Sequence, residues 1–317
     1  MRPIRFPMSS FPLRTPFLSA STATLATLFL TASLSHAVNR NWSAPASGDF
    51  NDGAKWDPAF VGIGAWTADI VTINTGLDNF PTMSTGTAAL TEIQVANTGA
   101  NVGKLAITGG SITLSDNITV GRQGTTQGTL LISGGGVLST RQFRVGGGST
   151  TAVGTATISG AGSTLNTGSG TGQAVVNVGA MGTGTLTLES GAVWNASISN
   201  PAIGADNNAP GVTGTAQGGN GTLNITSGAT FNGTNVNVAV GRNANGVGNL
   251  NVTSGGQFNI IRTAGAPFLN LANRNGNSTV PEGANFPVAN VTISGANSAI
   301  NVPHILVGYG TATLNLN

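Results

Sequence analysis

The sequence predicts an all-β fold, a right-handed parallel β-helix of about eight coils with an N-terminal capping segment. Three observations support this: one phrase recurs along the chain, its apolar residues are spaced two apart, and glycines interrupt every repeat. The phrase occurs eight times, with starts 21 to 41 residues apart: GKLAITGG (103–110), GTLLISGG (128–135), GTATISGAG (154–162), GTLTLESG (184–191), GTLNITSG (221–228), GNLNVTSG (248–255), ANVTISGA (289–296) and GTATLNL (310–316). Such a period is typical of a solenoid, whose units bury their apolar faces only by stacking.

Residues 1–37 are predicted to be a secretory signal that is cleaved after Ala37. Three arginines precede an apolar stretch at 20–34, and small residues, Ser35 and Ala37, occupy the −3 and −1 positions. An uncleaved N-terminal anchor is the alternative, although the stretch is short and diluted for a membrane span. Cleavage removes three of the 12 basic residues and none of the 10 acidic ones, so the mature chain carries a charge near −1. This near-neutrality excludes the basic footprint of a nucleic-acid or anionic-lipid binder.

Residues 38–100 are expected to cap the first coil, because the end of a solenoid exposes apolar core and unpaired backbone. They contain Trp42, Trp56 and Trp66. A carbohydrate-binding platform built from these three rings is the alternative function. Asp49, Asp52 and Asp57 also lie here, and we interpret them as turn and cap residues because they lack the regular loop of a calcium site.

Residues 101–317 are predicted to form the coils, each with three short inward-facing strands, because residues two apart share one face of a strand. The first strand carries an apolar pair: Leu105/Ile107, Leu130/Ile132, Ala156/Ile158, Leu186/Leu188, Leu223/Ile225, Leu250/Val252 and Val291/Ile293. The second carries one large apolar residue: Leu138, Leu165, Trp194, Phe231, Phe258 and Ile300. The third carries another pair: Ile118/Val120, Phe143/Val145, Val176/Val178, Val238/Val240, Leu269/Leu271 and Ile305/Val307. Glycine follows most of these third pairs, as expected at corners that need positive φ.

A polar residue directly follows the large apolar residue of the second strand, and in five repeats it is asparagine. These residues are Asn166, Asn195, Asn232, Asn259 and Asn301, with Ser139 in the equivalent place. We predict a structural ladder at a corner, in which each amide bonds the next coil and caps backbone groups that the bend leaves unpaired. A flat array of hydrogen-bonding groups for a sugar or an ice lattice is the alternative.

The residues of an enzyme or metal site are scarce, so we predict no catalytic residue, no cofactor and no metal. Only His304 remains after signal cleavage, and the chain has no cysteine. The acids of the repeats, Asp116, Glu189, Asp206 and Glu282, occupy different repeat positions. Stacking therefore does not assemble the paired carboxylates of glycosidic cleavage.

The run GTATISGAGSTLNTGSG at 154–170 and VVNVGAMGTGTLTLESGAVWN at 175–195 resembles the repeat associated with type V secretion and PEP-CTERM proteins. The opening NWSAPASGDFNDGAKWDP (41–58) is similar to the lead-in of such proteins, and the resemblance covers residues 41–317. It implies an exported bacterial β-solenoid like an autotransporter passenger, and it implies no catalytic residues. Members usually finish in an outer-membrane barrel or an anchoring tail, whereas this chain ends in GTATLNLN, so we expect a longer protein.

The function predicted from these observations is that of an exported or surface-displayed structural or adhesive protein without catalytic activity. Its expected partners are extracellular glycans, matrix or other cell surfaces, with no nucleic acid and no membrane span beyond the signal. Two alternatives remain. One is a polysaccharide-processing enzyme whose site lies in the N-terminal segment or beyond residue 317. The other is a glycan- or ice-binding face built from regular Thr and Asn rows.

Overall fold

The structure is a computed structural model that describes residues 37–59, 68–168, 174–204, 218–243, 245–273 and 286–317. The predicted signal therefore lies outside the described residues except for Ala37. The described residues form one compact unit. Within the described ranges the secondary structure consists of β-strands and one short 3-10 helix, η1 (Gly53–Lys55).

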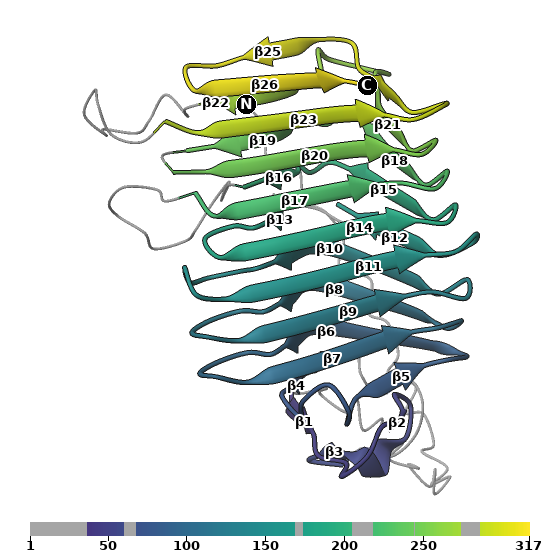
Figure 1. The fold of residues 1–317 in the computed structure, drawn as a ribbon. Coiled ribbons are helices and arrows are strands. Elements are labelled where there is room, and N and C mark those ends of the chain that lie inside the picture. Colours follow the sequence, from purple (N-terminus) through teal and green to yellow (C-terminus); the bar gives the residue numbers. More distant parts are fainter. Residues whose placement is uncertain (1–36, 60–67, 169–173, 205–217, 244, 274–285) are drawn as a thin grey trace, which may run out of the picture. The chain divides into compact units, whose positions relative to one another are not determined.

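The strands form two sheets (Figure 1). The ten-stranded sheet contains β2 (Gly48–Asp49), β5 (Pro81–Met83), β7 (Val102–Ile107), β9 (Gln127–Ile132), β11 (Val153–Ser159), β14 (Thr183–Glu189), β17 (Asn220–Ile225), β20 (Val247–Thr253), β23 (Val288–Ser294) and β26 (Thr311–Leu316). The sixteen-stranded sheet contains β1 (Asn39–Trp42), β3 (Trp56–Asp57), β4 (Ile70–Ile73), β6 (Thr87–Val95), β8 (Ser111–Val120), β10 (Val137–Val145), β12 (Thr164–Thr167), β13 (Val176–Val178), β15 (Val193–Ser197), β16 (Ala202–Ile203), β18 (Thr230–Thr234), β19 (Val238–Arg242), β21 (Gln257–Ile261), β22 (Leu269–Asn273), β24 (Ala299–Asn301) and β25 (Ile305–Val307).

The predicted parallel β-helix is confirmed by the pairing of these strands. Each strand of the ten-stranded sheet pairs in parallel with the corresponding strand of the next coil, so β7 pairs with β9 and β9 with β11. The strands of the other sheet also pair in parallel, and β1 with β3 is the antiparallel exception among the described pairs. The chain therefore alternates between the two sheets and advances one coil each time.

The predicted second and third strands of a coil are continuous in the early coils and separate in the later ones. β8 and β10 each run through both positions, with a register shift between Thr140 and Gln142. From β12 onward the second and third positions of a coil belong to separate strands. β12 pairs with the first half of β10, and β13 pairs with its second half. Part of the predicted capping segment follows the early pattern, because β6 pairs with β8 along its whole length.

The core lies between the two sheets and includes most of the predicted inward-facing residues. The burial of β14 alternates strictly, and Leu186 and Leu188 are fully buried. Trp194, Phe231 and Phe258 lie in successive coils, with neighbouring ring centroids 4.7 Å apart in both contacts. Apolar side chains of equal repeat position therefore stack along the axis.

Pairs of glycines form the corner that leads from one coil to the next. Gly179 has φ +69°, and a Cβ built on it would lie 2.2 Å from the carbonyl oxygen of Asn220 in the following coil. Its partner Gly184 is equally crowded, since its Cβ would lie 2.2 Å from the backbone nitrogen of Gly179. The recurring Val-Gly of the sequence therefore marks a corner where both the positive φ and the close approach require glycine.

The apolar residues of the last coil are exposed at the end of the stack. Ile305 and Val307 were predicted to face inward, and they line a pocket of about 250 Å³ together with Leu269 and Leu271. They are nevertheless 50% and 65% exposed, because no described strand packs on β25. A side chain that points inward is therefore buried only where its coil has a neighbouring coil on both sides.

Candidate functional site

The predicted asparagine ladder forms a continuous row of side-chain hydrogen bonds. Each amide nitrogen donates to the preceding residue of the row: Asn166 to Ser139 Oγ (3.2 Å), Asn195 to Asn166 (3.0 Å), Asn232 to Asn195 (3.3 Å), Asn259 to Asn232 (3.2 Å) and Asn301 to Asn259 (2.8 Å). The predicted corner location is wrong, because Asn166 and Asn195 lie inside β12 and β15 on the outward face. The backbone around them is paired with adjacent strands, so these amides bond one another.

Other asparagines perform the capping that was expected of the ladder. The Oδ1 of Asn74 accepts from the backbone nitrogen of Asn97 (2.8 Å), and the Oδ1 of Asn200 accepts from that of Asn237 (3.0 Å). Asn235 Oδ1 accepts from two backbone nitrogens beyond β21, at 2.7 and 2.8 Å. These residues lie between strands, where the bend leaves backbone groups unpaired.

Two of the three tryptophans proposed as a glycan platform are part of the core. Trp42 and Trp56 are each 2% exposed and meet edge to face with centroids 5.1 Å apart. The indole nitrogen of Trp56 donates to the carbonyl oxygen of Phe50 at 2.9 Å. The hypothesis that these two rings stack on sugars is therefore wrong, because neither face is open to solvent. Trp66 lies outside the described residues.

The acids of the N-terminal segment make local contacts. Asp49 Oδ1 accepts from the backbone nitrogen of Asn51 (2.9 Å), and Asp52 Oδ1 accepts from that of Ala54 (3.2 Å) at the start of η1. Asp57 is the last residue of the short β3, and it is exposed. In the described part of the chain, no three His, Cys, Asp or Glu residues gather in an arrangement that could hold a metal ion.

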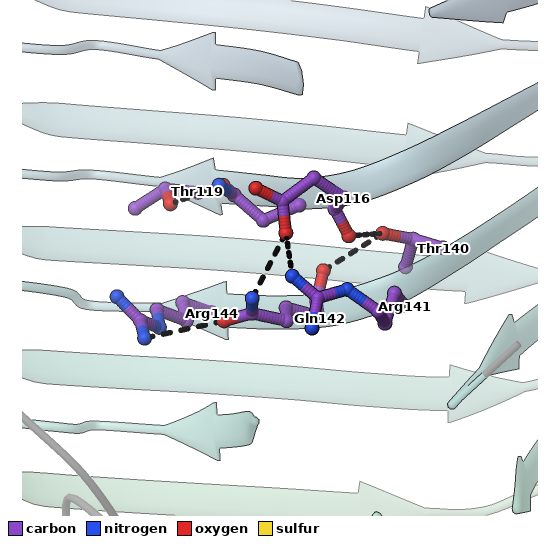
Figure 2. Close-up of polar contacts among 7 residues, drawn as sticks. Asp116, Thr119, Thr140, Arg141, Gln142 and Arg144 are labelled. Atoms are coloured by element: carbon purple, nitrogen blue, oxygen red, sulfur yellow. Dashed lines mark hydrogen bonds and ion pairs between the residues drawn. The ribbon is translucent and has the colours of Figure 1, made fainter. Parts of the chain in front are cut away.

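A polar cluster that sequence reasoning missed lies on the sixteen-stranded sheet, at the register shift between β8 and β10 (Figure 2). The carboxylate of Asp116 accepts from the guanidinium of Arg141 and, at 2.9 Å, from the amide of Gln142. The hydroxyl of Thr140 lies 3.2 and 2.8 Å from the carbonyl oxygens of Asp116 and Gln142. Arg144 donates to Gln142 at 3.3 Å. These contacts bridge the two strands at the register shift, although the Nε of Arg144 is buried there without a hydrogen-bond partner among the described residues.

The other acids and the histidine of the repeats do not join this cluster. Glu189 ends β14 on the opposite sheet, and His304 is an exposed residue beside β25. Asp206 and Glu282 lie outside the described residues. Within the described coils, Asp116, Glu189 and His304 therefore lie on separate elements.

The outward face of the ten-stranded sheet presents two parallel columns of side chains, which we call the Thr/Asn face. One column contains Lys104, Thr129, Thr155, Thr185, Thr222, Asn249, Asn290 and Thr313. The other contains Ala106, Leu131, Thr157, Thr187, Asn224, Asn251, Thr292 and Asn315. Lys104 is the single charged residue in the two columns, and its ammonium lies 4.0 Å from the ring centroid of Phe80. From β9 onward the two columns are uncharged, and the carboxylate of Glu189 lies beside them, two residues beyond Thr187 on the same side of β14.

The asparagines of this face form two further ladders, which the sequence analysis missed. Asn251 donates to Asn224 at 2.9 Å, and Asn224 donates to the hydroxyl of Thr187 at 3.3 Å. In the other column, Asn290 donates to Asn249 at 3.0 Å. Aligning the first strands of the eight phrases would reveal this pattern, because the columns follow directly from their register.

The threonines in the middle of the face are left with free hydroxyls. Those of Thr129, Thr155, Thr157 and Thr185 have no hydrogen-bond partner within the part of the chain that the structure describes. Thr155 is exposed and the other three are half-buried by their neighbours. Each hydroxyl can therefore donate and accept toward a ligand, and the adjacent asparagines offer amide groups.

Comparisons of the chain with protein-family models, curated proteins and solved structures find no match in any of the three. No helix within the described ranges is long and apolar enough to span a membrane.

Proposed function

We propose that this chain is an exported, non-catalytic adhesive protein whose Thr/Asn face binds neutral glycans on a matrix or cell surface. The observation that carries the proposal is the regularity of that face. Its threonines and asparagines keep one register through seven strands, from β9 to β26, without a charged side chain in the two columns. A binding surface for a neutral, hydroxyl-bearing partner requires such groups in an accessible position.

The chemistry of the face favours carbohydrate over other partners. Hydroxyl and amide groups both donate and accept hydrogen bonds, as sugar hydroxyls do. Beyond Lys104 the two columns carry no positive charge, so they give no electrostatic attraction to nucleic acid or anionic lipid. The threonine methyl groups add small apolar contacts of the kind that the carbon-bound hydrogens of a sugar ring can meet.

The N-terminal pattern and the repeat resemblance support export. Residues 1–37 have the basic, apolar and small-residue order of a secretory signal. The repeat phrases resemble those of exported bacterial β-solenoids, which suggests display at the cell surface or release from it. The absence of cysteine is compatible with this, because packing and strand pairing hold the coils together.

Export is tested by the N-terminus of the protein recovered from the cell surface or the medium. We expect that N-terminal sequencing of this material begins at Val38. Recovery of the protein inside the cell, with Met1 or the residue after it at its N-terminus, would contradict the export proposal without affecting the binding proposal.

Binding is tested on an array of neutral and charged glycans. The variant is T155V/T157V/T185V, which removes three hydroxyls from the Thr/Asn face and keeps the side-chain shape and the strand preference. The control is T113V/T230V, in which both threonines face outward on the sixteen-stranded sheet. We expect the variant to lose glycan binding and the control to retain it. Equal binding by the two proteins would refute the assignment of the site.

A further inference from the structure

The Thr/Asn face repeats in two directions without interruption. All strand pairs from β7 to β26 keep their register, whereas the sixteen-stranded sheet has register shifts in β6 and β10. Neighbouring coils are spaced by about 4.8 Å and residues two apart in a strand by about 6.6 Å. The four threonines Thr155, Thr157, Thr185 and Thr187 therefore occupy the corners of one lattice cell, because Thr155 pairs with Thr185 and Thr157 with Thr187.

The positions of this lattice alternate with buried positions along each strand. In β11 and β14 the face consists of threonines, and in β20 it presents two asparagines, Asn249 and Asn251. Every residue between them in the strand is buried and contributes to the core. The lattice thus offers many repeated positions, and it differs from a site that encloses one sugar.

A platform of this kind binds through many weak contacts that form at the same time. One hydrogen bond in open water contributes little net free energy, because it replaces a bond to water. Many bonds made at once by rigid partners combine without further cost in translational freedom. A flexible soluble chain would lose its conformational freedom on binding, whereas a chain already fixed in a solid has lost it beforehand.

We infer that the ligand of the Thr/Asn face is the ordered surface of an insoluble neutral polysaccharide. In such a solid, parallel chains present hydroxyl groups in two repeating directions, which matches the arrangement of the face. This inference rests on the proposed function and specifies the physical state of its ligand. The affinity then arises from several coils together, with a small contribution from each.

The test compares solid and soluble forms of the same polysaccharide. The full-length protein is mixed with microcrystalline cellulose and with crystalline chitin, and the protein that remains in solution is measured. We expect partition onto at least one solid, and we expect cellohexaose or chitohexaose at millimolar concentration to displace none of it. T157V alone is expected to weaken the partition a few-fold, and T155V/T157V/T185V at least tenfold.

The same T113V/T230V control, together with thermal unfolding followed by circular dichroism, separates binding from folding. The inference would be supported if the control partitions onto the solid like the wild type, the triple variant does not, and both variants keep the wild-type melting temperature. If the wild type binds the soluble hexasaccharides saturably and the triple variant does not, the inference is overturned and the proposed function stands. Binding to no glycan in either form would refute the proposed function itself. Threonine-dependent partition into growing ice, without partition onto either polysaccharide, would overturn both and assign the face to ordered water.

Discussion

At the scale of single residues, two glycines with similar positive φ have different surroundings. Gly179 has φ +69° and Gly228 has φ +72°. A Cβ on Gly179 would lie 2.2 Å from a backbone oxygen of the next coil, whereas nothing lies within 4 Å of a Cβ on Gly228. The pair therefore separates the cost of the left-handed conformation from the cost of close packing between coils.

We predict that Gly228→Ala lowers the free energy of unfolding by about 1–2 kcal/mol, the cost of a left-handed conformation for an L-residue. Gly179→Ala should lower it by about 3 kcal/mol or more, because the methyl group also forces two coils apart. Urea unfolding monitored by far-UV circular dichroism measures both. Equal losses would mean that backbone conformation alone explains why glycine follows valine at this corner of the repeats.

At the scale of elements, the asparagine ladder connects neighbouring strands through side chains as well as backbone. Asn195 of β15 donates to Asn166 of β12 at 3.0 Å, and both residues are directly paired in the sheet. Each single change to alanine should cost about 0.5–1.5 kcal/mol, the usual net value of a hydrogen bond.

The double variant N166A/N195A should cost less than the sum of the two single variants, since their shared bond is lost only once. We expect a coupling energy of at least about 0.5 kcal/mol in a double-mutant cycle of urea unfolding. Asn166 and Asn259 form the control pair, because two strands separate them in the sheet order and their effects should add. Additivity in the first pair would show that the bond between Asn166 and Asn195 contributes nothing to stability.

A buried ion pair fastens the N-terminal end of the stack. Arg40 of β1 is 8% exposed and pairs with Asp69, which is 3% exposed and immediately precedes β4. Asp69 Oδ1 also accepts from the backbone nitrogen of Val38, and Arg40 donates to the carbonyl oxygen of Pro58 at 2.7 Å. The pair thus connects three segments of the chain.

Asp69→Leu should lower the free energy of unfolding by about 3–5 kcal/mol, because it leaves the charge of Arg40 buried without its acid. The double variant R40L/D69L should cost less than Asp69→Leu alone, since no unpaired charge remains. Both are measured by urea unfolding of the full-length protein. A double variant that is at least as unstable as the single one would indicate that Arg40 acts through its contacts with the Pro58 segment.

The strands could be predicted from the sequence because their alternating apolar pattern is local. Features that depend on contacts between distant parts of the chain could not be predicted in this way. Leu130, Leu223 and Leu250 were predicted to face inward, and each is at most 1% exposed. The burial of Trp42 and the bonding of Asp116 to Arg141 depend on partners that lie 14 and 25 residues away along the chain. Likewise, the position of an asparagine within a repeat does not reveal whether a bend or a strand surrounds it.

At the scale of the whole molecule, the coils behave as equivalent layers. Gly221 of β17 and Gly248 of β20 are directly paired, so deletion of residues 221–247 joins Asn220 to a residue in the same register. After this deletion, Trp194 would face Phe258 in place of Phe231, and Asn195 would face Asn259 in place of Asn232. The chemistry of the contacts between layers is therefore preserved.

We predict that the protein lacking residues 221–247 folds with the same circular dichroism signal per residue and unfolds cooperatively. Its urea m value should fall roughly in proportion to the length removed, because m follows the surface exposed on unfolding. Deletion of residues 221–234 removes only part of a coil and brings a third-strand segment into first-strand register, so this control should lose cooperative folding. If the first deletion is as disruptive as the second, the coils are not interchangeable, because their stability then depends on more than nearest-neighbour contacts.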